Sequence, residues 1–275
     1  MTRLAAVIGS PVRHSLSPAM HNAVFQATGL DWRFTRFDVV AGGVPAALAA
    51  MSVLDIGGYA VTTPHKEAAA GAVDEVDPAA RALNSVNTVV LRDDGSTFGA
   101  STDGAGLVAW VEASGVPVAD ARVVVLGAGA AARSIVDALA RAGAADIAIV
   151  NRTASSAERA AALSPVAHVA GLDAVAAARL VVNATSVGMG TAECPLAPAL
   201  LNPGHAVADI VYHPLDTALL RAARAVGAQA IDGLGMLVHQ AVEQQQLWTG
   251  QRPDPALMRS AAEQALPTAR RARPS

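Results

Sequence analysis

The feature that most constrains the fold is a Val-rich strand followed directly by a glycine turn and an apolar helix, over residues 123–142. The turn consists of Gly127, Ala128, Gly129, Ala130, Ala131 and Ala132, which fits the pattern G-x-G-x-x-G/A. In this pattern the first glycine permits a tight turn, the second lets the backbone approach a pyrophosphate, and the small third residue allows the helix to pack closely on the strand. The segment therefore predicts a Rossmann-type dinucleotide site. The alternative is a glycine-containing turn that binds nothing.

Most of the chain shows the same alternation of short apolar runs with longer, Ala-rich segments. We expect strands at 4–8, 34–39, 58–61, 85–91, 97–99, 123–126, 147–150, 180–183, 206–210 and 229–231. We expect helices at 18–28, 44–51, 107–113, 131–142, 155–163, 236–247 and 255–266, with another after Pro64. This order predicts an α/β fold built from layered sheets and helices.

The length of the chain predicts more than one domain. At 275 residues it exceeds the roughly 100 to 200 residues of a compact domain. The first lobe is expected to end near Asp103, because Gly115 and Pro117 then interrupt the chain before a second α/β series begins at Arg122.

Composition excludes several classes of protein. The net charge of -3 and the pI near 6.1 argue against a nucleic-acid partner. Cys194 is the only cysteine, so neither an internal disulfide nor a thiolate metal cluster is expected, and no metal site is predicted. The N-terminus lacks a secretory signal pattern, and no apolar run reaches the roughly 20 residues of a membrane helix. We therefore expect a cytoplasmic protein without a membrane partner.

The strand after the glycine turn is followed by Asn151, Arg152 and Thr153, where an NAD-dependent enzyme usually carries an acidic residue for the ribose hydroxyls. A guanidinium there can pair with a 2′-phosphate, so NADP is favoured over NAD. The same residue disfavours an adenosylmethionine site. The alternative is an exposed arginine at the start of the next helix.

A second candidate site surrounds Lys66, in a segment that ends a strand and opens a helix. Pro64 suits the first helical turn, which would also contain Lys66. The helix dipole disfavours another positive charge there, and this favours proton transfer to or from the amine. The alternative is an ordinary surface lysine.

Asp103 and two serines complete the candidate residues. Asp103 follows Ser101 and Thr102 at the expected lobe junction, where ligand clefts form, and it can either orient the lysine or cap a helix. Ser15 and Ser17 precede a proline-started helix and can donate hydrogen bonds to a carboxylate, although Ser17 can also serve only as a helix cap.

Taken together, these segments resemble the shikimate dehydrogenase family, in order and over nearly the whole chain. The matching segments are HSLSP at 14–18, VTTPHKE at 61–67, VNT at 86–88, TDG at 102–104, GAG at 127–129, NRT at 151–153, NATS at 183–186 and DGLGML at 232–237. The resemblance implies a two-lobed α/β fold, in which residues 1–103, completed by 238–275, bind the substrate and residues 104–237 form a Rossmann-type NADP-binding domain. C-terminal helices would return to the first lobe.

The resemblance also implies a reaction and a role for each residue. The reaction is the reversible, NADP-dependent reduction of 3-dehydroshikimate to shikimate, a step in aromatic amino acid biosynthesis, by a monomer or homodimer. Lys66 would be the acid/base residue and Asp103 its partner. The substrate would contact Ser15, Ser17, Thr62, Asn87, Tyr212 and Gln240. The cofactor would contact Gly127, Ala128, Gly129, Ala130, Ala131, Asn151, Arg152 and Thr153, with Ile210, Gly233 and Met236 also on the cofactor side.

Some positions depart from the family pattern. Ala60 and Ser101 stand where the family commonly has asparagine, and Ser156 occupies a place where a second arginine often grips the 2′-phosphate. These changes leave open NAD as cofactor and a relative acting on quinate or an amino analogue, although Ser17, rather than threonine, is more like the shikimate enzymes. A non-catalytic dinucleotide sensor is the alternative outside enzymes, and the presence of both Lys66 and Asp103 argues against it.

Overall fold

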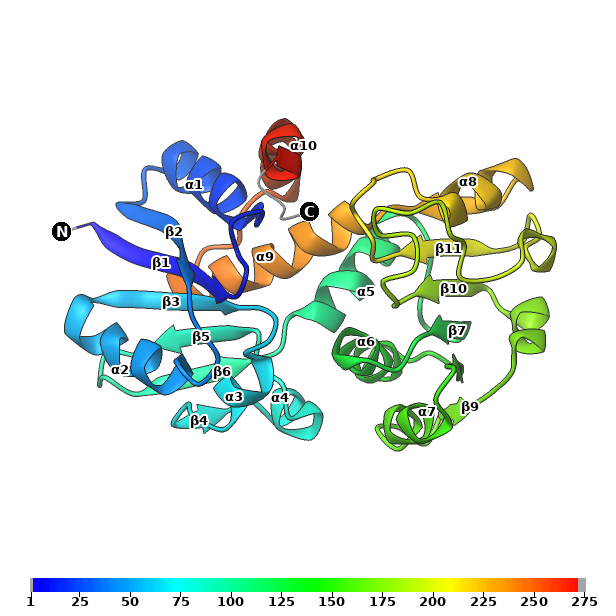
Figure 1. Cartoon of the computed structure of the whole chain (residues 1–275), viewed down its shortest axis with the longest axis horizontal. Helices are drawn as coiled ribbons and strands as arrows, with labels where there is room; N and C mark the ends of the chain where they lie inside the picture. The colour runs from blue at the N-terminus through cyan, green and yellow to red at the C-terminus, as the bar shows by residue number, and fades with distance from the viewer. Residues whose placement is uncertain (1, 272–275) are drawn as a thin grey trace. The chain divides into compact units, whose positions relative to one another are not determined.

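The computed structural model describes residues 2–271, so Met1 and 272–275, which the expected first domain includes, lie outside the described residues. The chain divides into two compact units (Figure 1). Unit 1 contains residues 2–102 and 240–271, and unit 2 contains residues 103–239. The second boundary falls inside helix α9 (Gly233–Thr249). The expected domain boundaries differ from this division by one residue at Asp103 and by two residues within α9.

Unit 1 is built on a mixed sheet of six strands in the order β2-β1-β3-β5-β6-β4. The strands are β1 (Arg3–Gly9), β2 (Trp32–Asp38), β3 (Ile56–Val61), β4 (Glu75–Val76), β5 (Thr88–Leu91) and β6 (Thr97–Ala100). Strand β1 pairs in parallel with β2 and β3, whereas β5 pairs antiparallel with β3 and β6. The helices of this unit are α1 (Ser17–Thr28), α2 (Val44–Leu54), α3 (Lys66–Ala70), α4 (Pro78–Leu83) and α10 (Pro255–Arg271), together with the second part of α9.

Both faces of the first sheet are covered. In β1, Ala6 and Ile8 belong to one buried cluster, and Ala5 and Val7 belong to another, as the alternation of side chains along a strand requires. Helix α10 packs on α1 (Figure 1). The C-terminal segment therefore completes the first unit, as expected from the resemblance.

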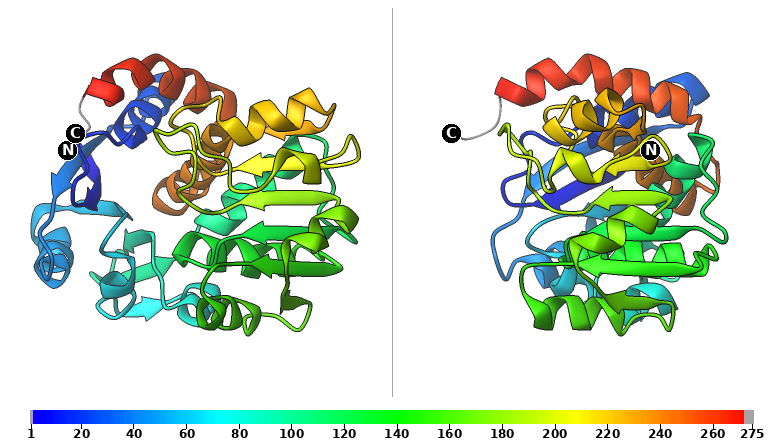
Figure 2. Two further views of the ribbon diagram at one scale, coloured as in Figure 1. Left: turned by 45° about the vertical axis from the view of Figure 1, so that its right-hand side comes forward. Right: turned by 90° about the vertical axis from the view of Figure 1, so that its right-hand side faces the viewer.

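Unit 2 is built on a fully parallel sheet in the order β12-β11-β10-β7-β8-β9 (Figure 2). Its strands are β7 (Arg122–Leu126), β8 (Asp146–Val150), β9 (Ala167–Val169), β10 (Leu180–Asn183), β11 (Ala206–Asp209) and β12 (Gln229–Ile231). Counted from β7, this is the order 6-5-4-1-2-3 of a doubly wound dinucleotide-binding fold, in which the direction of winding reverses between β7 and β10. The expected Rossmann-type domain is confirmed.

Apolar residues cover both faces of this second sheet. Val123 and Val125 of β7 lie in one buried cluster, whereas Val124 and Leu126 lie in another. The helices are α5 (Asp103–Ala113), α6 (Ala130–Arg141), α7 (Ala154–Ala161) and α8 (Ala218–Ala225), with the first part of α9 and the short 3-10 helices η1 (Leu172–Ala177) and η2 (Pro198–Leu200). Because a parallel sheet is buried on both sides, its strands read as continuous apolar runs rather than as alternating ones.

The sequence did not predict strands β4 and β9 or helices α4 and α8. Both missed helices carry a recognisable start. Asp77 caps α4 by accepting from the backbone N–H groups of Ala79 and Ala80, directly before Pro78, and Thr217 caps α8 by accepting from Leu220 N. The missed strands contain only two and three residues, too few to show a periodic pattern.

Several expected boundaries were wrong, including the start of α5, which begins at Asp103 rather than at Leu107. Helix α10 runs to Arg271 rather than ending before Pro267, since a proline disfavours the interior of a helix without forbidding it. Strand β5 begins at Thr88 rather than at Ser85. Helix α9 begins at Gly233, three residues before the expected start, because Asp232 Oδ1 accepts from the N–H groups of Leu234 and Gly235. No helix within residues 2–271 is long and apolar enough to cross a membrane.

Unit 1 contains a buried histidine whose titration predicts a pH-dependent stability. The ring of His21 is fully buried, bonds Gln245 Oε1 through Nδ1 (2.9 Å) and stacks on Phe34 with a centroid distance of 4.5 Å. Burial lowers the pKa of His21 from 6.5 to about 4. The unfolded chain therefore takes up a proton between pH 6.5 and 4 while the folded chain does not, so stability is complete above pH 6.5 and falls as the pH drops through this window.

We expect the free energy of unfolding to fall by about 2 kcal/mol between pH 7 and pH 5 on account of His21. Urea unfolding at the two pH values measures the difference, and in His21→Gln it should shrink by that amount. Val24→Ala provides the control, because it removes buried side-chain volume from the same helix but no titratable group, and it should leave the difference unchanged. An unchanged pH dependence in His21→Gln would contradict the assignment.

Candidate functional site

The glycine turn after β7 has the conformation that its sequence predicts. Gly127 has φ of +109°, a value that disfavours other residues, and its N–H donates to Val150 O (2.8 Å). A Cβ on Gly127 would lie 3.0 Å from Ala184 O, whereas a Cβ on Gly129 would meet no atom within 4 Å. Ala132 is fully buried. The first glycine is therefore required by the turn, and the second leaves open space for a ligand.

The turn leads into the N-terminus of α6 with its backbone donors uncapped. Gly129 is the N-cap residue and has no side chain, so no protein side chain at the cap accepts from the first N–H groups of the helix. Ala130 and Ala131 carry two of these donors. Such a helix end favours an anion through its N–H groups and its dipole.

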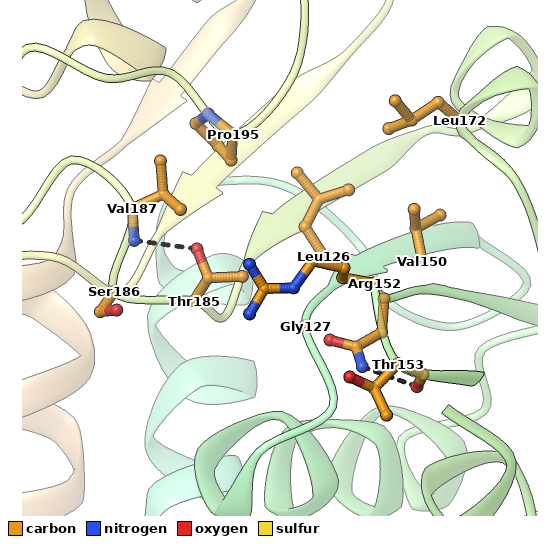
Figure 3. A pocket seen from close by; sticks show the side chains of 11 residues that line it. Leu126, Gly127, Val150, Arg152, Thr153, Leu172, Thr185, Ser186, Val187 and Pro195 are labelled. Atoms are coloured by element: carbon orange, nitrogen blue, oxygen red, sulfur yellow. Dashed lines mark hydrogen bonds between the residues drawn. The ribbon is translucent and has the colours of Figure 1, made fainter. Parts of the chain in front are cut away.

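A cavity of about 500 Å³ lies at the carboxyl ends of the central strands of this sheet (Figure 3). It is lined by Leu126 and Gly127 after β7, by residues 150–153 at the end of β8, and by residues 185–187 after β10. Strands β7 and β10 flank the point at which the strand order reverses, which is where ligands bind in open α/β sheets. The cavity has the position of a dinucleotide site.

Arg152 is the charged side chain of this cavity. It is exposed, makes no hydrogen bond or ion pair within the described part of the chain, and extends toward Thr185 (Figure 3). Asn151 Nδ2 donates to Thr153 O (2.9 Å) and so stabilises the bend that carries Arg152. The nearby Ser156, in contrast, accepts from Arg159 Nη2 (2.9 Å). The cavity therefore offers an available guanidinium to an anionic ligand.

No sequence pattern assigns a chemical role to residues 185–187, although Thr185 and Ser186 belong to the matching segment NATS at 183–186. Its place on the cavity depends on the order of the strands, which brings the end of β10 next to the end of β7. Leu172 and Pro195, which also line the cavity, carry no sequence pattern that could have identified them.

In unit 1, the two candidate serines lie together at the start of α1. Ser15 Oγ donates to Ser17 Oγ (3.2 Å) and accepts from Ser17 N (3.3 Å), whereas Ser17 itself is the first residue of the helix. The interpretation of Ser17 as a helix cap was wrong, because Ser17 lies inside the helix and its own backbone N–H group donates to Ser15 Oγ. Arg36, which the sequence analysis did not single out, donates from Nη2 to Ser15 O (2.7 Å) and holds the loop. Burial lowers the pKa of Arg36.

Asn87 and Gln240 belong to one buried network, and its backbone groups determine the orientation of both amides. Thr102 N donates to Asn87 Oδ1 (2.8 Å), so Asn87 Nδ2 is the atom that donates to Gln240 Oε1 (3.2 Å). Gln244 Nε2 donates to the same oxygen of Gln240 (3.1 Å) and to Asn87 O (3.3 Å). Gln240 therefore has its oxygen inside the network, and the other end of its amide is a hydrogen-bond donor.

Lys66 is the first residue of α3, after an N-cap at His65. Pro64 precedes this cap, so the expectation that Pro64 lies in the first helical turn was wrong: the turn at 62–65, closed by His65 N donating to Thr62 O (2.9 Å), comes before the helix. The ring of His65 is buried and bonds Val39 O through Nε2 (2.6 Å). Thr62 follows β3 directly, which places Thr62 and Lys66 at the same end of the first sheet.

The composition of the chain holds a signal at Lys66 that the motif analysis missed. The sequence contains 20 lysine and arginine residues, and Lys66 is the only lysine among them. A guanidinium does not give up its proton in proteins, whereas an ammonium can. All other lysine or arginine positions of the chain are occupied by arginine. Position 66 is therefore the one among them that holds a side chain able to transfer a proton.

The remaining candidates lie in unit 2. Asp103 is the first residue of α5, which packs so closely on α6 that a Cβ on Gly104 would lie 2.0 Å from Ser134 O. Tyr212 lies after β11, and its ring is 6.3 Å from that of His213. Met236 is buried in the core on one side of the sheet.

Gly233 has a clear packing reason for being glycine. A Cβ on this residue would lie 2.6 Å from the carbonyl oxygen of Ile210, so the start of α9 can approach the end of β11 only without a side chain. The candidates Ile210 and Gly233 are thereby brought into contact. The described residues contain no group of three or more His, Cys, Asp and Glu side chains that could hold a metal ion.

Three family models match the chain, and their segments follow one another along it. The shikimate dehydrogenase substrate-binding domain matches residues 7–89, shikimate/quinate 5-dehydrogenase matches residues 111–192, and the shikimate 5′-dehydrogenase C-terminal domain matches residues 233–263.

Known relatives match over nearly their whole length. The NADP(+) shikimate dehydrogenase of Moorella thermoacetica is 42% identical over 96% of this chain and 94% of its own. Shikimate 5-dehydrogenase of Thermus thermophilus in complex with NADP(H) and shikimate is 38% identical, with a TM-score of 0.89 over 96% of this chain and 100% of its own. Quinate dehydrogenase of Corynebacterium glutamicum in complex with NAD is 33% identical, with a TM-score of 0.89 over 96% and 99%. Site geometry, family models and relatives agree, and this chain belongs to the shikimate dehydrogenase family.

Proposed function

We propose that this protein catalyses the reversible, NADP-dependent reduction of 3-dehydroshikimate to shikimate, within aromatic amino acid biosynthesis. The observation that carries the proposal is the cavity at the strand-order reversal, which combines an open glycine turn with the available guanidinium of Arg152. Relatives at 42% and 38% identity that are named for this activity, one of them with both ligands bound, support the substrate and the cofactor.

The residues at the cavity fit NADP. The uncapped N–H groups at Ala130 and Ala131 suit a pyrophosphate, the open side of Gly129 leaves it room, and Arg152 suits a 2′-phosphate. Asn151 and Thr153 stabilise the bend around Arg152. When bound, NADPH supplies the hydride of the reaction. The protein itself binds the two anionic groups and keeps the cofactor in place.

The proton is proposed to come from Lys66. As the ring ketone becomes an alcohol, the Lys66 ammonium donates a proton to its oxygen, and in the reverse direction the amine accepts it. We assign Asp103 as the partner that stabilises the lysine in its charged form. Arginine at position 66 would not serve, because a guanidinium holds its proton too tightly.

The polar groups of unit 1 are proposed to bind the cyclohexene acid. Ser15 and Ser17 would donate to its carboxylate, and Thr62 and Gln240 would contact ring oxygens, with Tyr212 also assigned to the substrate. Asn87 already bonds Gln240 and Thr102, so it reaches the substrate only by exchanging one of these bonds and otherwise acts by orienting Gln240. Ile210, Gly233 and Met236 are assigned to the nicotinamide end of the cofactor.

A spectrophotometric assay tests the proposal directly. Shikimate, quinate and an amino analogue of shikimate are each offered with NADP and with NAD, and reduction of the cofactor is followed. We expect kcat/KM to be highest for shikimate with NADP. A preference for quinate with NAD would favour the alternative represented by the quinate dehydrogenase relative. NADP binding without oxidation of any of these acids would favour a dinucleotide sensor. Activity restricted to the amino analogue would indicate an enzyme specific for that compound.

We further propose that the protein is cytoplasmic and is either a monomer or a homodimer. The mass in solution, measured by analytical ultracentrifugation, distinguishes the two states.

A further inference from the structure

A buried carboxylate lies next to the dinucleotide cavity without lining it. Asp209 is the last residue of β11 and is 1% exposed. Its Oδ1 accepts from Asn183 Nδ2 (2.9 Å) and Val211 N (3.0 Å), and its Oδ2 accepts from Thr217 Oγ1 (2.7 Å). Burial raises the pKa of Asp209, and these three bonds oppose the increase. All three neighbours are donors, which is the environment that an ionised carboxylate requires.

Asn183, the last residue of β10, connects Asp209 to the segment that follows this strand. Besides its bond to Asp209, Asn183 Nδ2 donates to Val187 O (3.2 Å). Asn183 Oδ1 accepts from both Thr185 N (3.1 Å) and Thr185 Oγ1 (2.7 Å). The amide thus uses both of its hydrogens and both lone pairs, and within residues 2–271 its one partner outside the segment 183–187 is Asp209.

The chain of bonds ends at residues that line the cavity. Thr185 Oγ1 accepts from Val187 N (3.0 Å), as Figure 3 shows, and Thr185, Ser186 and Val187 together form one wall. The backbone of this wall has no regular secondary structure and no sheet ladder, although Met189 N donates to Ser186 O (3.0 Å). Thr185 and Val187 are the wall residues that bond Asn183, so their positions depend on the orientation of its amide.

We propose that Asp209 is a positioning residue for the dinucleotide: by fixing the Asn183 amide, its carboxylate holds the wall at 185–187 in the conformation that binds the cofactor. The proposal rests on the proposed function, since it takes the cavity as the NADP site. It adds a residue that touches neither the cavity nor the substrate side chains assigned above.

The Thr217 bond gives a matched control. Thr217 Oγ1 occupies the other carboxylate oxygen and caps α8, so Thr217→Val removes one hydrogen bond to Asp209 and one helix cap while leaving the bond between Asp209 and Asn183 intact. A merely structural role for Asp209 predicts that both variants act alike. The positioning role predicts that only a change on the Asn183 side affects cofactor binding.

The test compares Asp209→Asn with Thr217→Val in the full chain. Replacing the carboxylate by a neutral amide of the same shape weakens a charge-assisted bond, so the NADPH dissociation constant, measured by fluorescence, should rise roughly 5- to 10-fold in Asp209→Asn. It should stay within twofold of wild type in Thr217→Val, even where that variant melts at a lower temperature. The KM for shikimate at saturating NADP should be unchanged in both. Equal changes in NADPH binding, or none in Asp209→Asn, would overturn the proposal.

Hydrogen exchange gives a readout that depends neither on turnover nor on ligand. The backbone amides of residues 185–187 should exchange at least several-fold faster in Asp209→Asn than in wild type or Thr217→Val, and equal exchange in all three would also count against the anchor. If Asp209→Asn does not fold, both measurements use Asn183→Ser instead. This variant removes the side-chain amide that bonds Asp209 and the wall. A wild-type protein that binds NADPH without oxidising shikimate would refute the proposed activity and leave this inference standing.

Discussion

Replacement of Lys66 by alanine should lower kcat for shikimate oxidation by roughly 10²- to 10⁴-fold, with the KM for shikimate changed by less than about threefold. The reason is that the alcohol must lose a proton as hydride leaves, and alanine has no group to accept it. Steady-state kinetics with NADP and shikimate measures both constants. Near-normal turnover would exclude Lys66 as the acid/base residue.

A charge-preserving variant separates proton transfer from electrostatic binding. Lys66→Arg keeps the positive charge but cannot release a proton, so it should be nearly as inactive as the alanine variant. Because Lys66 is the only lysine, acetylation of the wild-type protein with an activated acetate ester modifies a single side-chain amine, together with the amino terminus, and converts it to an amide that cannot accept a proton. Activity lost on acetylation and protected by bound shikimate would support the same role without a substitution.

Replacement of Arg152 by alanine should raise the KM for NADP roughly 10- to 100-fold and leave the KM for NAD almost unchanged. The physical reason is that the guanidinium can pair with the 2′-phosphate, which NAD lacks. Arg152 has no other partner in the described part of the chain, so no hydrogen bond or ion pair has to break for this pairing. Initial rates against each cofactor at saturating shikimate measure the two constants.

Arg141 provides the control for this substitution. It lies at the opposite end of α6 from the glycine turn, where it pairs with Asp137 at 2.9 Å. Arg141→Ala removes the same charge from the same unit and should change neither KM. If Arg152→Ala raises both constants equally, the 2′-phosphate role is refuted and Arg152 contributes only a general binding surface.

Particular elements show why the core of the fold was predictable. The strand β7, the turn at Gly127 and the helix α6 are specified within 20 consecutive residues, since positive φ, a small residue at Ala132 and an apolar run are local requirements. The strands β8, β10 and β11 were found for a similar reason: a parallel sheet buried on both faces leaves an unbroken apolar run in the sequence. Short edge strands such as β4 leave no such trace.

The sequence could propose candidate residues for the site but not the hydrogen bonds that connect them. Lys66 and Arg152 could be proposed because each closely follows a recognisable strand, β3 and β8 respectively. The roles of Asp209 and Thr217 could not be proposed in this way, because no sequence motif marks either residue. Their bonds to each other and to Asn183 join separate segments of the chain, and the spacing between those segments in the sequence says nothing about their distance in space.

The sequence by itself determined the glycine turn, the arginine that follows the next strand and the solitary lysine, because each of these depends on local geometry or on the chemistry of one side chain. Only the tertiary structure decided that the end of β10 lies beside the turn, and that a buried carboxylate holds the wall formed there. Strand order and hydrogen bonds between distant segments arise when the sheet assembles, and no local pattern encodes them.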